Sequence, residues 1–375
     1  MRPLAALALA GLLTACGRES PPPPAPVGDW HWKLPTGVAP PPVPADNPMS
    51  QAKFELGRRL FYDKRLSGNG RISCASCHPQ DKAFSDSVAL SLGSTGERTL
   101  RNAQPLANAA WRKSYTWANY SLTTLERQMD GPLFRTDPVE MGINDHNLPT
   151  VLARLGADPL YQREFARVFP AEGQPLSLAN IVKAIATFER GIVSFDSRYD
   201  RYQAGRAGLS AAELRGLKLF RSEQGQCLRC HGSPDFDDQM AGHGDSLPFH
   251  NIGLYNTDGK GGYPFPNRGA LELSGQPADM GRFRSPSLRN VALTAPYMHD
   301  GSVATLEEAV RIHAEHGRRG AKGGDGRRNP WKDAAIDRIQ LSAAEQADIV
   351  AFLKTLTDDT LTRDPRLADP FAARR

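Results

Sequence analysis

The 375-residue sequence predicts a mainly α-helical fold of two related units with long ordered loops, and three observations support this prediction. The first is an internal repeat, in which Gly57 precedes Leu60-Phe61 and Gly216 precedes Leu219-Phe220 at the same spacing. The second is a set of helix start signals followed by apolar residues at helical spacing. The third is that no run of alternating β-branched residues indicates a sheet. A chain of this length is sufficient for two domains.

The first residues predict export from the cytoplasm. Arg2 precedes an apolar run from Leu4 to Leu13, which is too short to span a bilayer and fits a secretory signal peptide over residues 1–15. The run ends in Leu-Thr-Ala-Cys-Gly around Cys16, which resembles a bacterial lipobox, so Cys16 is predicted to be lipidated. The alternative is an ordinary signal peptide with a chance cysteine. The expected location is the periplasmic side of a bacterial membrane, with the lipid anchor at Cys16.

Residues 16–48 form a proline-rich stretch that lacks the apolar residues needed for a core. Such a composition favours extended polyproline geometry, so the stretch is predicted to be a lipidated, semi-rigid tether that lifts the body off the membrane. Within it, residues 30–32 read Trp-His-Trp and are expected to pack onto the body.

Three helix starts are indicated further along the chain. Ser210, Thr305 and Ser342 are each followed three residues later by a glutamate, which is the capping-box pattern. Behind the last of them, the apolar residues of the segment 349–356 follow helical spacing. The region 233–286 is rich in glycine and proline and is predicted to be a long ordered loop, a kind of segment that often carries function.

Two Cys-x-x-Cys-His motifs carry the chemistry, and each follows one copy of the repeat. Their residues are Cys74, Cys77 and His78 in the first copy and Cys227, Cys230 and His231 in the second. In this motif the two thiols form thioether bonds to haem c and the adjacent imidazole ligates the iron. A zinc site would need neither histidine, and a redox dithiol would be expected in a βαβ context that is missing here. The sequence therefore predicts two cytochrome c-like helical domains, at residues 49–205 and 206–375, each carrying one covalently bound c-type haem.

The composition excludes few other functions but offers no support for nucleic-acid binding. Apolar residues make up 40% and charged residues 23% of the chain, as in soluble globular proteins. The formal charge of +5 is spread along the chain without basic blocks or interleaved aromatic residues.

His313 is the candidate sixth ligand of the second haem iron. On the helix after Thr305, Leu306, Ala309, Val310 and His313 recur at helical spacing, which places His313 on the apolar face. A hydrogen-bonded core histidine is the alternative for such a residue. The other candidate ligands are Met298 and Tyr297, whereas His316 beside Gly317 is expected to act as a cation at the helix end.

Several motifs resemble one family, the bacterial dihaem cytochrome c peroxidases and their relative MauG. The segment 288–301 (Leu-Arg-Asn-Val-Ala-Leu-Thr-Ala-Pro-Tyr-Met-His-Asp-Gly) resembles the second-domain signature, and Arg-Asn-Ala at 101–103 and Glu-Met-Gly at 140–142 match first-domain motifs. The segments 65–70 and 251–256 are similar to those of MbnH-like dihaem enzymes, which are encoded beside a copper-binding MbnP partner. The resemblance covers roughly residues 48–358.

The resemblance implies a calcium ion between the haems. In the family an asparagine near the first haem and the carbonyls of a threonine and a proline of the second domain bind this ion, and Asn102, Thr294 and Pro296 stand at those places. Carbonyl oxygens suit this hard cation. The alternative is that Thr294 and Pro296 only shape a turn.

The resemblance also implies catalytic residues at the first haem. Glu140 and Gln128 match the family's distal glutamate and glutamine, with a slightly longer separation here. A carboxylate over an open iron can take a proton from peroxide and return it to the leaving oxygen. Trp117 best matches the tryptophan that relays electrons between the haems, although it is one residue out of register, and Trp111 is the second choice.

Two departures from the peroxidases are visible. The segment 87–100 contains no histidine that could cap the first haem, so this haem is expected to be open. At the position matching the Met of the peroxidases and the Tyr of MauG stands His313, which implies a low-spin second haem of low potential.

The resemblance therefore implies a haem-dependent oxidoreductase of the MauG/MbnH type. It would use hydrogen peroxide at the first haem to oxidise a periplasmic partner protein, such as a copper-binding MbnP-like protein, through a high-valent dihaem state. One alternative is a conventional cytochrome c peroxidase that takes electrons from a small cytochrome. The other is a non-enzymatic dihaem electron carrier.

Overall fold

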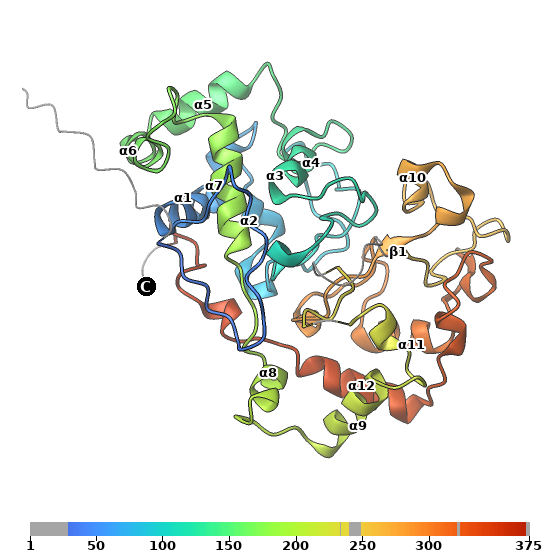
Figure 1. The fold of residues 1–375 in the computed structure, drawn as a ribbon. Helices are drawn as coiled ribbons and strands as arrows, with labels where there is room; N and C mark the ends of the chain where they lie inside the picture. The colour runs from blue at the N-terminus through green and yellow to red at the C-terminus, as the bar shows by residue number, and fades with distance from the viewer. Residues whose placement is uncertain (1–28, 233, 240–248, 321–322, 373–375) are drawn as a thin grey trace, which may run out of the picture.

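The computed structural model describes residues 29–232, 234–239, 249–320 and 323–372, and it confirms the predicted mainly helical fold (Figure 1). The predicted signal peptide and Cys16 lie outside the described residues. The helices are α1 (Gln51–Tyr62), α2 (Cys74–Cys77), α3 (Leu125–Gln128), α4 (Asp130–Phe134), α5 (Leu148–Gly156), α6 (Pro159–Val168), α7 (Leu178–Arg190), α8 (Arg198–Gln203), α9 (Ala211–Phe220), α10 (Leu271–Ser274), α11 (Leu306–Ala314) and α12 (Ala343–Lys354), with short 3-10 helices between them.

Strands are minimal in the described chain. Antiparallel β1 (Phe249–His250) and β2 (Phe283–Arg284) form one pair, and antiparallel β3 (Arg319–Gly320) and β4 (Gly324–Asp325) form another. The predicted long loop 233–286 therefore contains β1, α10 and β2 in its described part. No helix among the described residues has the length and apolar character that would let it cross a membrane.

The internal repeat is a repeated helix crossing. In the first unit α1 packs against α7, and in the second α9 packs against α12 (Figure 1). A Cβ atom built on Gly57 would lie 1.9 Å from the carbonyl oxygen of Ala184, and one on Gly216 would lie 1.9 Å from that of Asp348. Because no side chain fits at either position, glycine allows each pair of helices to cross closely.

Each crossing is surrounded by its own aromatic core. Phe61, Phe84 and Phe188 lie in the core of the first unit, and Phe220, Phe236 and Phe352 lie in that of the second. The ring centroids of Phe61 and Phe188 are 5.0 Å apart, and those of Phe220 and Phe352 are 5.3 Å apart. The two units therefore bury matching side chains at matching places.

Helix capping follows the sequence signals with one difference. Ser210 and Ser342 form reciprocal capping boxes with the glutamates three residues later. At Thr305 the structure has one of the two hydrogen bonds of a capping box: the Thr305 hydroxyl accepts the N–H of Glu308 at 3.1 Å.

Both ends of the described chain pack onto the first unit. Trp30 contacts Phe54 with ring centroids 4.9 Å apart, as expected for the Trp-His-Trp segment, and the fully buried Asn47 accepts a hydrogen bond from Lys53 Nζ at 2.9 Å. Of the predicted tether, residues 29–48 thus lie against the body, and residues 16–28 lie outside the described chain.

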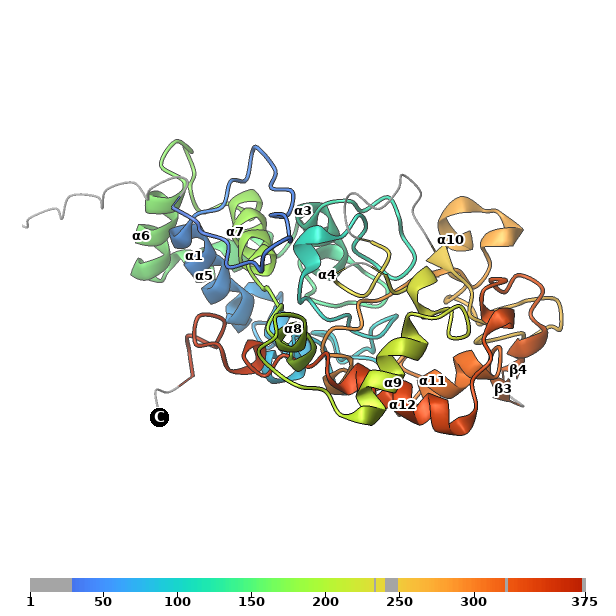
Figure 2. The ribbon, with the colours of Figure 1, turned by 60° about the horizontal axis from the view of Figure 1, so that its bottom comes forward.

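The C-terminal segment 359–372 leaves the second unit and returns to the first (Figures 1 and 2). Leu361 and Leu367 are buried in the core of the first unit, and the Tyr62 hydroxyl donates to the Leu367 carbonyl at 2.8 Å. In addition, Tyr199 on α8 belongs to the core of the second unit. The sequence indicated neither of these connections.

Candidate functional site

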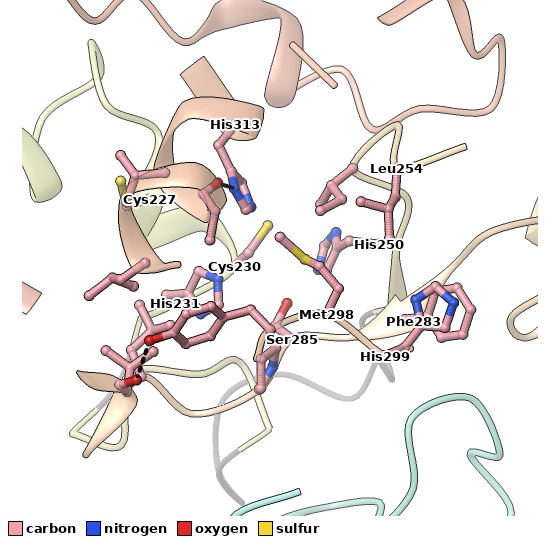
Figure 3. Close-up of a pocket in the computed structure, with 18 of the residues that line it drawn as sticks. Cys227, Cys230, His231, His250, Leu254, Phe283, Ser285, Met298, His299 and His313 are labelled. Atoms are coloured by element: carbon pink, nitrogen blue, oxygen red, sulfur yellow. Dashed lines mark hydrogen bonds between the residues drawn. The ribbon is translucent and has the colours of Figure 1, made fainter. Parts of the chain in front are cut away.

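The second unit contains a mainly apolar cavity at whose wall the second Cys-x-x-Cys-His motif lies (Figure 3). Cys227, Cys230 and His231 come from the segment after α9. The predicted apolar face of α11, comprising Leu306, Ala309, Val310 and His313, forms part of the same wall. The cavity therefore brings the predicted proximal and distal histidines together.

Three histidines have the geometry of iron ligands. The Nδ1 atom of His78 lies 2.8 Å from the Phe84 carbonyl oxygen, that of His231 lies 3.2 Å from the Phe236 carbonyl, and that of His313 lies 2.8 Å from the Ala309 carbonyl. Because a carbonyl can only accept, each Nδ1 carries the proton and each Nε2 keeps its lone pair.

The protonation state of these rings also suits a metal ligand. Burial lowers the pKa of His78, His231 and His313, which keeps all three imidazoles neutral. A neutral imidazole whose Nδ1–H is fixed by a carbonyl is the usual form of a haem ligand. The residues present therefore fit the two haems that the motifs predict.

The carbonyls that orient the proximal histidines come from residues in an uncommon conformation. Phe84 has φ 58° and Phe236 has φ 55°, so both lie in the left-handed region although they carry bulky side chains. Each phenylalanine ring is buried in its core, while the carbonyl faces the histidine. The sequence does not indicate this conformation, because phenylalanine rarely adopts a positive φ.

Among the alternatives to His313, Tyr297 is occupied elsewhere. Its hydroxyl donates to the Val291 carbonyl at 3.0 Å, and burial raises its pKa to about 12, so it stays a neutral phenol. Met298 projects into the cavity together with His313 (Figure 3). His316 lies beyond the end of α11, where its Nε2 lies 2.8 Å from the Ile339 carbonyl, so it holds a loop and does not cap the helix as expected.

At the first site, the predicted proximal residues lie on and directly after the short helix α2. Cys74 and Cys77 form its ends, and the capping box of Ser73 and Ser76 starts it. His78 is the C-cap residue of this helix.

Glu140 lies near this site. Burial raises the pKa of the Cys77 thiol, and the negative charge of Glu140 contributes to this shift. The Glu140 side chain is 27% exposed, and its Oε1 lies 3.8 Å from Arg135 Nε. Burial raises the pKa of Glu140, and Arg135 opposes this shift. A half-buried carboxyl group with a raised pKa is suited to proton transfer.

Gln128 is at the C-terminal end of α3 and is partly buried. The helix α4 follows directly, and the Pro132 carbonyl on it accepts the N–H of Met141 at 2.9 Å. The segment of Glu140 therefore runs beside α4, the helix that follows the one carrying Gln128.

Other histidines of the described first unit lie at the surface. His31 and His146 are both exposed, and the segment 87–100 is an ordered loop without histidine. Near its start, Asp86 accepts a hydrogen bond from Ser91. Among the described residues of the first unit, His78 is the only histidine whose side chain is not exposed.

Trp117 lies between the two units, whereas Trp111 does not reach the cavity. Trp117 is 8% exposed, lines the cavity wall, and donates its indole N–H to the Asn102 carbonyl at 2.9 Å. Trp111 packs against Trp32 and Phe195 and donates to the Ala39 carbonyl. The geometry thus favours Trp117 over the second choice.

The three residues predicted to bind calcium line the same cavity. The amide nitrogen of Asn102 donates to the carbonyls of Val88 and Ala89 at 3.1 and 3.2 Å, so its Oδ1 points away from them. Asn102 also receives support across the units, because its backbone N–H donates to the His299 carbonyl at 2.9 Å. Asn102 of the first unit and Thr294 and Pro296 of the second therefore share the wall of one cavity.

Three polar residues of the cavity wall, His250, Arg284 and His299, were not predicted from the sequence. In His250, Nδ1 lies 2.8 Å from Asp333 Oδ2, and Nε2 lies 2.8 Å from Asp238 Oδ2. Burial alone would lower the pKa of His250, but these two carboxylates raise it far above its ordinary value. Arg284 is 2% exposed, and burial lowers its pKa. His299 stacks on Phe283 with ring centroids 3.7 Å apart (Figure 3). Of the three, only His299 lies in a motif identified from the sequence, the segment 288–301.

Fold and geometry together define a protein with two c-type haem sites, of which the second has two facing histidines. Comparison with known proteins identifies the class further, and the chain belongs to the dihaem cytochrome c peroxidase and MauG family. The family profile described as di-haem cytochrome c peroxidase matches residues 51–208. The chain is therefore a haem-dependent oxidoreductase with two c-type haems, and the alternative of a non-enzymatic electron carrier is not retained.

Individual relatives span nearly the whole chain. Cytochrome-c peroxidase IdrP1 of Denitromonas iodatirespirans is 35% identical over 96% of this chain and 95% of that protein. The methylamine utilization protein MauG of Methylorubrum extorquens is 33% identical over 84% of this chain and 81% of that protein. A crystal structure described as a MauG-like protein associated with microbial copper homeostasis is 55% identical, with a TM-score of 0.88, and covers 91% of this chain and 99% of that one. The family uses hydrogen peroxide and partner proteins and is typically periplasmic.

Proposed function

We propose that this enzyme uses hydrogen peroxide at the first haem to oxidise a partner protein, as MauG- and MbnH-type enzymes do. One observation carries the proposal: the two sites differ in their supply of a sixth iron ligand. His313 faces His231 across the cavity of the second unit, while every other histidine of the described first unit besides His78 is exposed. An open first site can bind peroxide, and a closed second site can hold charge.

In this proposal the haems are held by His78 in the first unit and by His231 with His313 in the second, through thioether bonds to the four motif cysteines. When bound, they supply the cleavage of the peroxide O–O bond and store the two oxidising equivalents. The protein supplies the proton transfers: Glu140 takes a proton from peroxide and returns it to the leaving oxygen, with Gln128 beside it. The raised pKa of Glu140 supports this role.

Trp117 is the relay between the units, and a calcium ion bound by Asn102, Thr294 and Pro296 holds the junction together. A direct contact between Trp117 and Asn102 supports both roles, because the Trp117 indole donates to the Asn102 carbonyl at 2.9 Å. Carbonyl and amide oxygens are the ligands that calcium prefers.

The partner class is a periplasmic copper-binding protein similar to MbnP. This choice is supported by the 55% identity to a MauG-like protein associated with microbial copper homeostasis. An anchor at Cys16 would keep the enzyme on the periplasmic side of a membrane, where such a partner is found.

The test is to mix the holoenzyme with an MbnP-like partner and peroxide and to examine the partner by peptide mass spectrometry. We expect an oxidised side chain on the partner that depends on both enzyme and peroxide. A partner that stays unmodified while a small reduced cytochrome is consumed would instead support the conventional peroxidase. That second candidate is favoured by the 32% identity to cytochrome c551 peroxidase of Nitrosomonas europaea.

A further inference from the structure

Beside the cavity of the second unit lies a short path of aromatic rings that leads toward the surface. Tyr263 lines the cavity and is 5% exposed. Its ring centroid is 5.4 Å from that of Tyr255, which lies outside the cavity wall and is only half-buried. Tyr255 lies two residues before the exposed turn 257–260, with the buried Asn256 between them. The two rings therefore connect the interior of the second unit with its surface.

The two tyrosines differ in what accepts their hydroxyl proton. The Tyr263 hydroxyl donates to the amide oxygen of Asn251 at 2.8 Å, and an amide is a poor proton acceptor. The Tyr255 hydroxyl donates to the carboxylate oxygen Oδ2 of Asp300 at 2.5 Å. Since a tyrosine that loses an electron must also lose its phenolic proton, Tyr255 is the ring with a base already in place.

The surroundings hold this pair in position. Asp300 Oδ1 accepts the N–H of Ser302 at 3.0 Å, which leaves Oδ2 for the phenol. The guanidinium of Arg318 lies 4.3 Å from the centroid of the Tyr255 ring and donates to Ser302 Oγ at 2.7 Å. A cation over the ring disfavours a positively charged ring, so oxidation there favours simultaneous loss of the proton.

We propose that Tyr255, reached through Tyr263, is the site from which oxidising equivalents leave the second unit for the partner protein. An electron moves from Tyr255 to the oxidised dihaem centre that peroxide has produced, and the phenolic O–H bond breaks as its proton moves to Asp300 Oδ2. An oxidisable aromatic side chain of the partner then returns one electron, and Asp300 returns the proton. The inference rests on the proposed function, because peroxide is the source of the oxidant.

The step has a spectroscopic test on the holoenzyme without partner. Peroxide is added to the diferric protein, and freeze-quenched samples are examined by EPR as the oxidised state decays. We expect the signal of a neutral tyrosyl radical, with a hyperfine pattern that collapses when the tyrosines carry deuterated rings. Because this comparison uses the unaltered sequence, it does not depend on how a variant folds.

Two variants then locate the radical. Tyr255→Phe keeps the aromatic ring but lacks the phenolic hydroxyl. Asp300→Asn keeps the size of the side chain but replaces the carboxylate with an amide, which is a poor proton acceptor. We expect each to remove the radical signal and to slow the decay of the oxidised state about tenfold, which corresponds to about 1.4 kcal/mol of activation free energy. The matched control is Tyr120→Phe, a tyrosine whose ring packs against Phe249. It should behave as the unaltered enzyme.

The outcomes separate the two proposals. If peroxide produces the oxidised state but the radical persists in Tyr255→Phe, the exit site is wrong and the proposed function stands. If the diferric protein does not react with peroxide, both are overturned.

Discussion

The imidazole of His313 donates its Nδ1–H to the Ala309 carbonyl 2.8 Å away, so Nε2 is the atom left for iron. Replacing His313 with alanine removes this ligand, and we expect the second haem to change from low-spin to high-spin in EPR and absorbance spectra. The matched control is His316→Ala, because the His316 ring hydrogen-bonds to the Ile339 carbonyl in a loop and is not assigned to the iron. A low-spin spectrum that survives in His313→Ala would transfer the ligand role to Met298.

In the proposed reaction we expect Glu140 to set the pH dependence of the step with peroxide. Its deprotonated form takes the proton, so the rate constant falls as pH drops through its pKa, and burial places that fall above the ordinary value of 4.5. We expect Glu140→Gln to lower the rate constant by about 10²–10⁴-fold and to remove this acid limb. Stopped-flow measurement across pH checks it, with the exposed Glu172→Gln as control. An unchanged rate and profile in Glu140→Gln would show that another group transfers the proton.

At the scale of residues, the sequence was sufficient where chemistry fixes spacing. The Cys-x-x-Cys-His motifs require thiols and imidazole in fixed order, and helical periodicity placed His313 on the cavity side of α11. It was insufficient for His250 and Tyr255, whose partners Asp333 and Asp300 lie 83 and 45 residues away. Such pairs arise from tertiary contacts that no local pattern contains.

The helix crossings are the elements on which each unit depends. A Cβ atom at Gly216 would lie 1.9 Å from the Asp348 carbonyl oxygen and 2.9 Å from Phe352 Cβ, so α9 and α12 would have to move apart. We expect Gly216→Ala to lower the free energy of unfolding of the second unit by about 1–3 kcal/mol, the usual cost of overpacking. Denaturant unfolding followed through the haem absorbance measures it.

Gly208→Ala is the control for this change, because a Cβ atom there meets nothing within 4 Å. It should leave the stability unchanged or raise it by a few tenths of a kcal/mol, through lower entropy of the unfolded chain. Equal stabilities of the two variants would contradict the role given to the crossing.

Helices with strong caps and periodicity could be predicted, since their signals are local. The loops after each motif could not, because Phe84 and Phe236 adopt positive φ only where a buried ring and a histidine hydrogen bond hold them. Sequence reports residue preference, and here the tertiary environment overrides it.

The whole molecule joins its two units more closely than the repeat suggested. The tail 359–372 returns to the first unit, where Gln80 Nε2 donates to the carbonyls of Leu361 and Asp364 at 2.9 Å each. At the other contact, Trp117 and Asn102 of the first unit share the cavity wall with Thr294 and Pro296 of the second. The family resemblance indicated the second contact, whereas the tail has no motif that could reveal its partner.

We propose that the two haems have unequal tasks, with the first open to peroxide and the second closed by His313. The most direct measurement is EPR and stopped-flow absorbance of the resting diferric protein before and after addition of peroxide, with no reductant present. This difference between the haems predicts one high-spin and one low-spin ferric haem at rest, and conversion of both by peroxide to a long-lived oxidised state. A diferric protein that reacts with peroxide only after its second haem has been reduced would contradict it.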